Sequence, residues 1–164
     1  MRPHRIEPGP GQESVWDYPR PPRLERTGRR IEVVFAGITI VDTDRAWRVL
    51  ETSHPPIYYV PRDAISPRHL FDSARTTYCE WKGSARYVDV RVGDRRANGA
   101  AWYYPRPTAG FEPIRDHLAF YPAAMDRCAV DGEVVVPQPG RFYGGWITPD
   151  VVGPFKGAPG SEFW

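Results

Sequence analysis

The fold is decided by one central stretch, Thr76–Val92, which reads TTYCEWKGSARYVDVRV. Its second half alternates between an apolar face and a mixed face, Val88, Val90 and Val92 against Tyr87, Asp89 and Arg91. A period of two residues is typical of a β-strand, because successive side chains point to opposite faces of a sheet. The stretch therefore predicts a sheet with one buried side and one solvated side.

Turn signals extend this pattern outward along the chain. Gly83-Ser84 divides the stretch into strands expected over 76–82 and 85–92, and Gly93-Asp94 leads into a strand that ends near Tyr104. Short apolar runs bounded by turn residues predict five more strands, at residues 31–35, 38–41, 57–60, 117–121 and 127–136.

Local signals also predict hairpins and short helices. Ala36-Gly37 and Asp131-Gly132 are hairpin turn signals. Thr43-Asp44 can cap a short helix over 45–51, and a second short helix is expected near 66–71. The expected fold is therefore mainly β, with two antiparallel sheets and one or two short helices.

The composition agrees with this fold and with one domain. The 164 residues include 19 Pro, 15 Gly and 22 aromatic residues, a mixture that disfavours helices and favours pleated, half-buried surfaces. Residues 1–13 are expected to form a flexible tail and residues 14–137 a single domain. The Gly/Pro-rich segment 138–164 carries enough aromatic residues that it should pack on the body or on a neighbouring chain, so a homodimer stays open.

Charge and cysteine content exclude several classes of protein. The net charge of +2, without a basic run, disfavours nucleic-acid binding, and no apolar stretch is long enough to span a membrane. Cys79 and Cys128 are the only cysteines and form no CxxC pair, so neither a four-thiolate zinc site nor any other cofactor is expected. The start of the chain lacks the apolar region of a signal peptide, which predicts a cytoplasmic protein.

Four segments together resemble the bacterial domain-of-unknown-function 427 family. They are ETSHPPIYYVP at 51–61, TYCEWKG at 77–83, AWYYP at 101–105 and LAFYP at 118–122. The resemblance covers about residues 29–137 and implies a β-tent-like fold. Distant relatives with that fold, the thalidomide-binding domain of cereblon and methionine sulfoxide reductase B, commonly hold a zinc on four cysteines, which this chain cannot build. The family also carries a nucleotidyltransferase-style name. This sequence has neither the paired carboxylates that would hold Mg²⁺ nor a phosphate-binding loop, so it gives that name no support.

Aromatic density is the strongest functional signal. The residues that carry it are Trp47, Tyr58, Tyr59, Trp81, Trp102, Tyr104, Phe120 and Tyr121. They either fill the core or both fill it and line a pocket for a flat or cationic ligand. The leading hypothesis is a metal-free pocket for a small organic molecule. The candidate ligand-binding residues are Arg48, Glu51, His54, Tyr59, Glu80, Trp81, Lys82, Trp102 and Tyr104.

The alternative hypothesis is a small cofactor-free hydrolase or transferase. Its reactive groups would be Cys79 with His54, or Glu80 with Lys82. Each residue also has a plain structural explanation: a thiol beside a tryptophan is usually buried and inert, and charges two apart on a strand usually form a weak surface pair. Lysine is rare here, with two against 20 arginines, which favours a functional role for Lys82.

Overall fold

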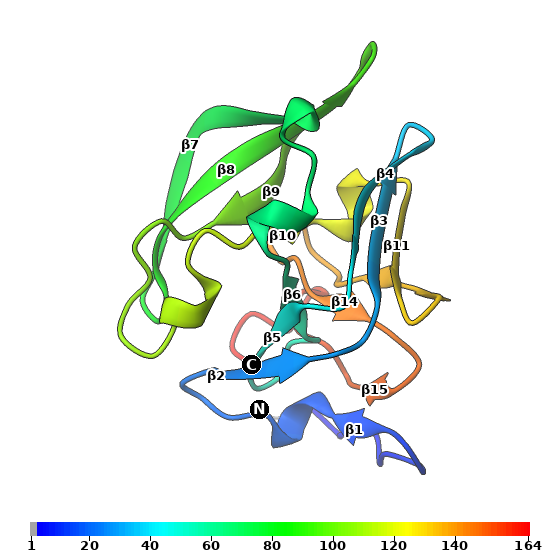
Figure 1. Cartoon of the computed structure of the whole chain (residues 1–164). Helices are drawn as coiled ribbons and strands as arrows, with labels where there is room; N and C mark the ends of the chain where they lie inside the picture. Colours follow the sequence, from blue (N-terminus) through cyan, green and yellow to red (C-terminus); the bar gives the residue numbers. More distant parts are fainter. Residues whose placement is uncertain (1–2) are drawn as a thin grey trace.

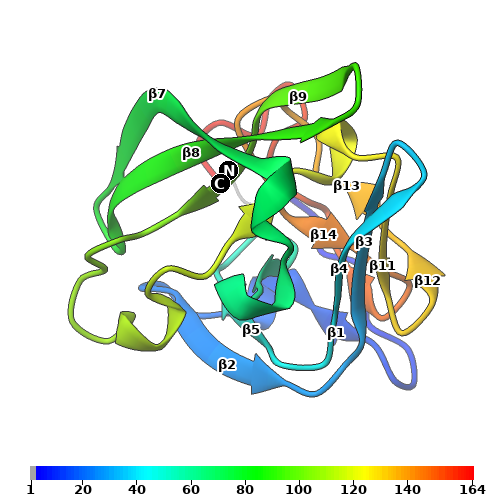
Figure 2. The same ribbon diagram turned by 45° about the horizontal axis from the view of Figure 1, so that its top comes forward.

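Antiparallel sheets make up most of the computed structural model, which describes residues 3–164 (Figure 1). Strands account for 46% of the protein and helical turns for 9%, and no helix of seven or more residues occurs in the described residues. Figure 2 shows the two larger sheets as separate leaves that do not close into a barrel. The predicted mainly β class is therefore confirmed.

The first large sheet contains the central stretch. Its strands, in spatial order, are β10 (Ala119–Phe120), β9 (Arg95–Tyr103), β8 (Gly83–Val92) and β7 (Leu70–Cys79). The turn at Gly93-Asp94 is where the sequence predicts it. The preceding turn comes earlier than predicted, because Cys79 pairs with Gly83 and residues 80–82 form the connection. Gly83 has a φ of 105°, and a glycine with positive φ after the loop is typical of three-residue hairpin connections.

The second large sheet is built from two hairpins. Its strands, in spatial order, are β12 (Glu133–Val134), β11 (Arg127–Val130), β3 (Ile31–Phe35) and β4 (Ile38–Thr43). The hairpins turn at Ala36-Gly37 and Asp131-Gly132, as predicted, and all four turn residues have positive φ. That conformation matches the type I′ turn, whose twist suits paired strands.

The predicted helix over 45–51 is wrong. The chain forms a strand there, β5 (Ala46–Leu50), which pairs with β2 (Arg23–Thr27) on one side and β6 (Ile57–Tyr59) on the other. The Thr43 hydroxyl does accept a hydrogen bond from the Arg45 backbone N–H, as a helix cap would, but only within a local turn. Pairing on both edges of β5 outweighs the capping signal, since helix propensity is a weak prior.

Only short helical turns occur elsewhere. The predicted helix near 66–71 is one 3₁₀ turn at Pro67–His69, after which β7 begins. The other 3₁₀ turns are Val15–Asp17, Arg62–Ala64, Glu112–Ile114 and Pro122–Ala124.

The two faces of strand β8 contribute residues to different buried clusters. Val88 and Val90 belong to the cluster that faces the second large sheet, whereas Ala85 and Tyr87 belong to a cluster with the aromatic residues of β6 and β9. The expected solvated face is therefore covered near Tyr87, which is 3% exposed. This covered face carries the candidate site.

The C-terminal segment packs against the body through short strands. These are β13 (Val136–Pro137), which pairs with β14 (Trp146–Ile147), and β15 (Val151–Val152), which runs parallel to β1 (Glu13–Ser14) (Figure 1). The Ile6 backbone N–H also donates to the Gly153 carbonyl at 3.0 Å. The division into a tail, a domain and a C-terminal segment stays a prediction.

Candidate ligand-binding site

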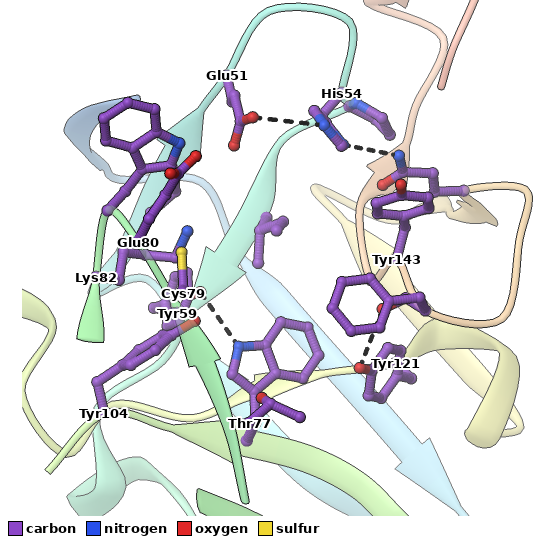
Figure 3. Close-up of a pocket in the computed structure, with 18 of the residues that line it drawn as sticks. Glu51, His54, Tyr59, Thr77, Cys79, Glu80, Lys82, Tyr104, Tyr121 and Tyr143 are labelled. Carbon is purple, nitrogen blue, oxygen red and sulfur yellow. Dashed lines mark hydrogen bonds and ion pairs between the residues drawn. The ribbon is translucent and has the colours of Figure 1, made fainter. Parts of the chain in front are cut away.

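A cavity of about 270 Å³ opens on the covered face of the first large sheet. Figure 3 shows Cys79 and Lys82 on one side of it and His54 and Tyr143 on the other. The residues come from β7 and its connection to β8, from β9, from the loop between β5 and β6, and from the C-terminal segment. Eight candidate residues line it: Glu51, His54, Tyr59, Glu80, Trp81, Lys82, Trp102 and Tyr104.

Arg48, the ninth candidate, lies outside the cavity. A helix would have placed Arg48 and Glu51 on one face, but Arg48 lies in strand β5 and Glu51 follows the last residue of that strand, so helical spacing does not bring them together. The Arg48 guanidinium instead bonds Glu13 Oε1 at 2.7 Å and Glu25 Oε1 at 2.6 Å. These contacts tie β5 to β1 and β2, and Arg48 does not line this cavity.

Aromatic rings form the floor of the cavity. Trp102 Nε1 donates to the Tyr59 hydroxyl at 3.3 Å, and the Trp102 ring lies 4.5 Å from the ring of Tyr121. Tyr104 continues the row, its ring centroid 6.3 Å from that of Tyr59. Burial raises the pKa of Tyr59 and Tyr104 well above the usual value, so both phenols stay neutral at pH 7. These rings pack as core and also border open space.

Lys82 is the most unusual charged residue of the cavity. It is 6% exposed, and within residues 3–164 its ammonium has neither a hydrogen-bond acceptor nor a carboxylate within 4.0 Å. Its Nζ lies over the Tyr104 ring, 5.9 Å from the ring centroid. A buried lysine is normally paired, and the unpaired Nζ of Lys82 is not fully enclosed by protein, so its charge is accessible from the cavity.

The backbone around Lys82 is held firmly. The Lys82 carbonyl accepts a hydrogen bond from the Thr108 N–H at 3.0 Å, and the Thr108 hydroxyl donates to the carbonyl of Trp81. A Cβ at Gly83 would lie 3.2 Å from the Arg106 carbonyl oxygen, so the loop packs closely on the turn. The 80–82 connection is therefore positioned by a second loop.

His54 occupies the opposite wall and is neutral at pH 7. Its Nδ1 accepts a hydrogen bond from the Gln138 amide at 3.0 Å, which leaves the proton on Nε2, 3.6 Å from Glu51 Oε2. Burial, together with the positive charges of Lys156 and Arg20, lowers the pKa of His54 to about 4. The neighbouring Glu51 therefore does not hold a charged imidazole.

The residue pairs of the enzyme hypothesis are not joined. Within the described chain, Cys79 makes no hydrogen bond to His54, and Figure 3 places them on different walls. Glu80 and Lys82 form no salt bridge in residues 3–164, so the Glu80 carboxylate oxygens and Lys82 Nζ are more than 4.0 Å apart. Cys128 is buried in the other cluster, and burial raises its pKa to about 12.

The C-terminal segment contributes residues that sequence reasoning missed. Gln138, Tyr143 and Lys156 all line the cavity. Lys156 carried a usable signal, because it and Lys82 are the only lysines of the chain and both reach the same cavity. Gln138 carried no signal in the sequence, because its role depends on its hydrogen bond to His54, which is distant along the chain.

Gly144 is the point where the C-terminal segment touches the aromatic floor. A Cβ at this position would overlap the Trp102 ring and lie 3.3 Å from Tyr121. We therefore expect Gly144→Ala to displace Trp102 and to lower the free energy of unfolding by about 1–3 kcal/mol, the usual cost of overpacking. Urea denaturation monitored by tryptophan fluorescence measures this change.

Gly28→Ala is the matched control for this substitution. A Cβ at Gly28 meets nothing within 4 Å, so stability should stay within about 0.5 kcal/mol of the parent. Equal stability of Gly144→Ala and Gly28→Ala would contradict the close contact between Gly144 and Trp102.

The lining of the cavity combines neutral hydrogen-bonding groups with the charged side chains of Glu51, Glu80, Lys82 and Lys156. Among residues 3–164, no three of His, Cys, Asp and Glu converge so that they could hold a metal ion. None of the helical turns in that part of the chain is long and apolar enough to cross a membrane.

A comparison with models of known families matches about two thirds of the chain. The model of a family described as a domain of unknown function, DUF427, matches residues 23–131, which include β2 through β11. No curated protein matches the chain.

Proposed function

The chain belongs to the domain-of-unknown-function 427 family, and from that premise we propose that it binds a small organic ligand in its aromatic cavity. The function of the family is uncharacterised, so the proposal rests on the cavity itself. The observation that carries it is the enclosed row of Tyr59, Trp102 and Tyr104, which borders about 270 Å³ of open space.

The shape and lining of the cavity support a small ring compound. Ligand pockets typically have volumes of about 300–1,000 Å³ and combine apolar walls with a few polar groups, so this cavity, at about 270 Å³, lies just below that range and suits a small ligand. Flat aromatic walls favour a flat ligand, because offset and edge contacts between rings add to the burial of apolar area. Lys82 and the neutral His54 supply polar groups at opposite ends.

A thermal-shift screen of small ring compounds tests the proposal. A compound at about 100 times its Kd stabilises the folded protein by about 2.7 kcal/mol, which should raise the Tm by about 5 °C or more. Trp81→Ala should lessen that rise, since Trp81 lines the cavity. Trp16→Ala is the matched control, because Trp16 packs outside the cavity against Val15 and Leu50.

Two results would count against the proposal. If no ring compound in a broad library shifts the Tm, the cavity has no small-molecule role. If a hit responds to Trp16→Ala and not to Trp81→Ala, the ligand binds elsewhere on the protein.

A further inference from the structure

The charges around the cavity leave one positive group without a partner. Glu51 is compensated by Arg20, whose Nε lies 3.5 Å from Glu51 Oε2. Lys156 Nζ donates to the Trp164 carbonyl at 3.1 Å. Glu80 is exposed at the edge. Among the described residues of the cavity, Lys82 is the buried cation whose donors are not already engaged, so it is the positive group most available to a ligand that enters.

The chemistry of an ammonium group limits what can satisfy it. A lysine ammonium has three donors and no acceptor, so its partner must supply lone pairs, and a charged acceptor gives the stronger bond. One unpaired cation balances one negative charge. The carboxylate of Glu80 has no ion-pair partner in residues 3–164 and lines the same cavity, so a second negative charge on the ligand would be repelled, which disfavours a phosphate monoester and favours a carboxylate.

The neighbours of Lys82 define the rest of the ligand. The Tyr104 ring lies 5.9 Å from Lys82 Nζ, and Trp81 is the preceding residue of the same connection. A carboxylate held at Nζ therefore projects its substituent along an aromatic surface. The volume of about 270 Å³ limits that substituent to one or two rings.

We infer that the ligand is a small aromatic carboxylate, with its carboxylate paired to Lys82 and its ring against Tyr104 and Trp102. This inference rests on the proposed function, which it makes specific by assigning a charge and a ligand class. The fixed backbone at residues 81–83 supports it, because a preorganised lysine loses less freedom when it binds.

Matched pairs of probes test the inference against the parent protein. The probes are benzoate, 4-hydroxybenzoate, indole-3-carboxylate and quinoline-2-carboxylate, each compared with its own carboxamide by titration calorimetry at pH 7. The two members of a pair share shape and differ in charge. We expect at least one carboxylate to bind about tenfold or more tightly than its carboxamide, the difference typical of a hydrogen bond to a charged group.

Lys82→Met separates the lysine from the rest of the cavity. The variant should bind the carboxylate and the carboxamide about equally, with the affinity for the carboxamide within about threefold of the parent value. Lys156→Met removes the other lysine of the cavity and should keep the tenfold preference. Urea denaturation of both variants verifies that they fold.

The outcomes distinguish the inference from the proposed function. If carboxamides bind as tightly as carboxylates, or if Lys156→Met and not Lys82→Met abolishes the preference, the assignment to Lys82 is wrong while the cavity still binds rings. If neither member of any pair binds, and the wider screen is also empty, both proposals fail.

Discussion

Replacing Trp146 by alanine should lower the free energy of unfolding by about 3–5 kcal/mol, the usual cost of truncating a buried tryptophan. Trp146 is 1% exposed, and its ring lies 5.2 Å from that of Tyr58 in the larger core cluster. Its Nε1 also donates to the Phe120 carbonyl at 3.0 Å. The substitution would therefore leave both a cavity and an unsatisfied buried carbonyl.

The expected loss is large because domains of this size are marginally stable, with total stabilities of about 5–15 kcal/mol. Urea denaturation at pH 7 measures it. Phe163→Ala is the matched control: the Phe163 side chain is 97% exposed in the same C-terminal segment, so its removal should change stability by no more than about 0.5 kcal/mol.

The result bears on how the chain is organised. Trp146 lies beyond the residues 23–131 that match the family model, yet its backbone N–H donates to the Pro56 carbonyl at 2.8 Å. If Trp146→Ala were as stable as Phe163→Ala, the C-terminal segment would be an appendage and the cavity wall that it supplies would be dispensable.

The strands could be predicted from the sequence where pattern and turn chemistry agree. In β3, Ile31, Val33 and Phe35 alternate with partly exposed residues, and the following Ala36-Gly37 turn fixes the end of the strand. The prediction failed over 45–51. The capping signal there depends on neighbouring residues, whereas β5 is determined by its pairing with strands that are distant in the sequence. A single sequence contains the residues that form turns, but it does not show which strand edges will pair with each other.

The candidate site followed the same division. Glu80, Trp81 and Lys82 were found because they are close in sequence to the strand that positions them, although their connection was assigned to the strand itself. Arg48 was placed at the cavity because a helix was expected over residues that form strand β5. Gln138 was out of reach, because its partner His54 is 84 residues away.

A decrease in pH from 7.5 to 4.5 should destabilise the protein by about 2–3 kcal/mol through His54 alone. Burial lowers the pKa of His54 from 6.5 to about 4 in the folded state, and the charges of Lys156, Arg20 and Lys82 act in the same direction. The hydrogen bond from Gln138 opposes them without reversing the shift.

The sign follows from proton binding. Between about pH 6.5 and pH 4 the unfolded chain binds a proton on His54 and the folded protein does not, so acid favours unfolding throughout that window. Each unit of pKa difference corresponds to about 1.36 kcal/mol, and the loss is complete below the folded-state pKa. Above pH 6.5 both states are neutral at this residue and its contribution to the pH dependence vanishes.

His54→Gln isolates this contribution, because glutamine can keep a hydrogen bond to Gln138 and cannot take up a proton. The free energy of unfolding is measured by urea denaturation at several values between pH 7.5 and pH 4.5, and the slopes are compared, since the substitution itself shifts the whole curve. We expect the variant to lose most of the slope of the parent. Parallel curves would mean that the imidazole titrates alike in both states, and that the wall formed by His54, Gln138 and Tyr143 is open to water instead of closing the cavity.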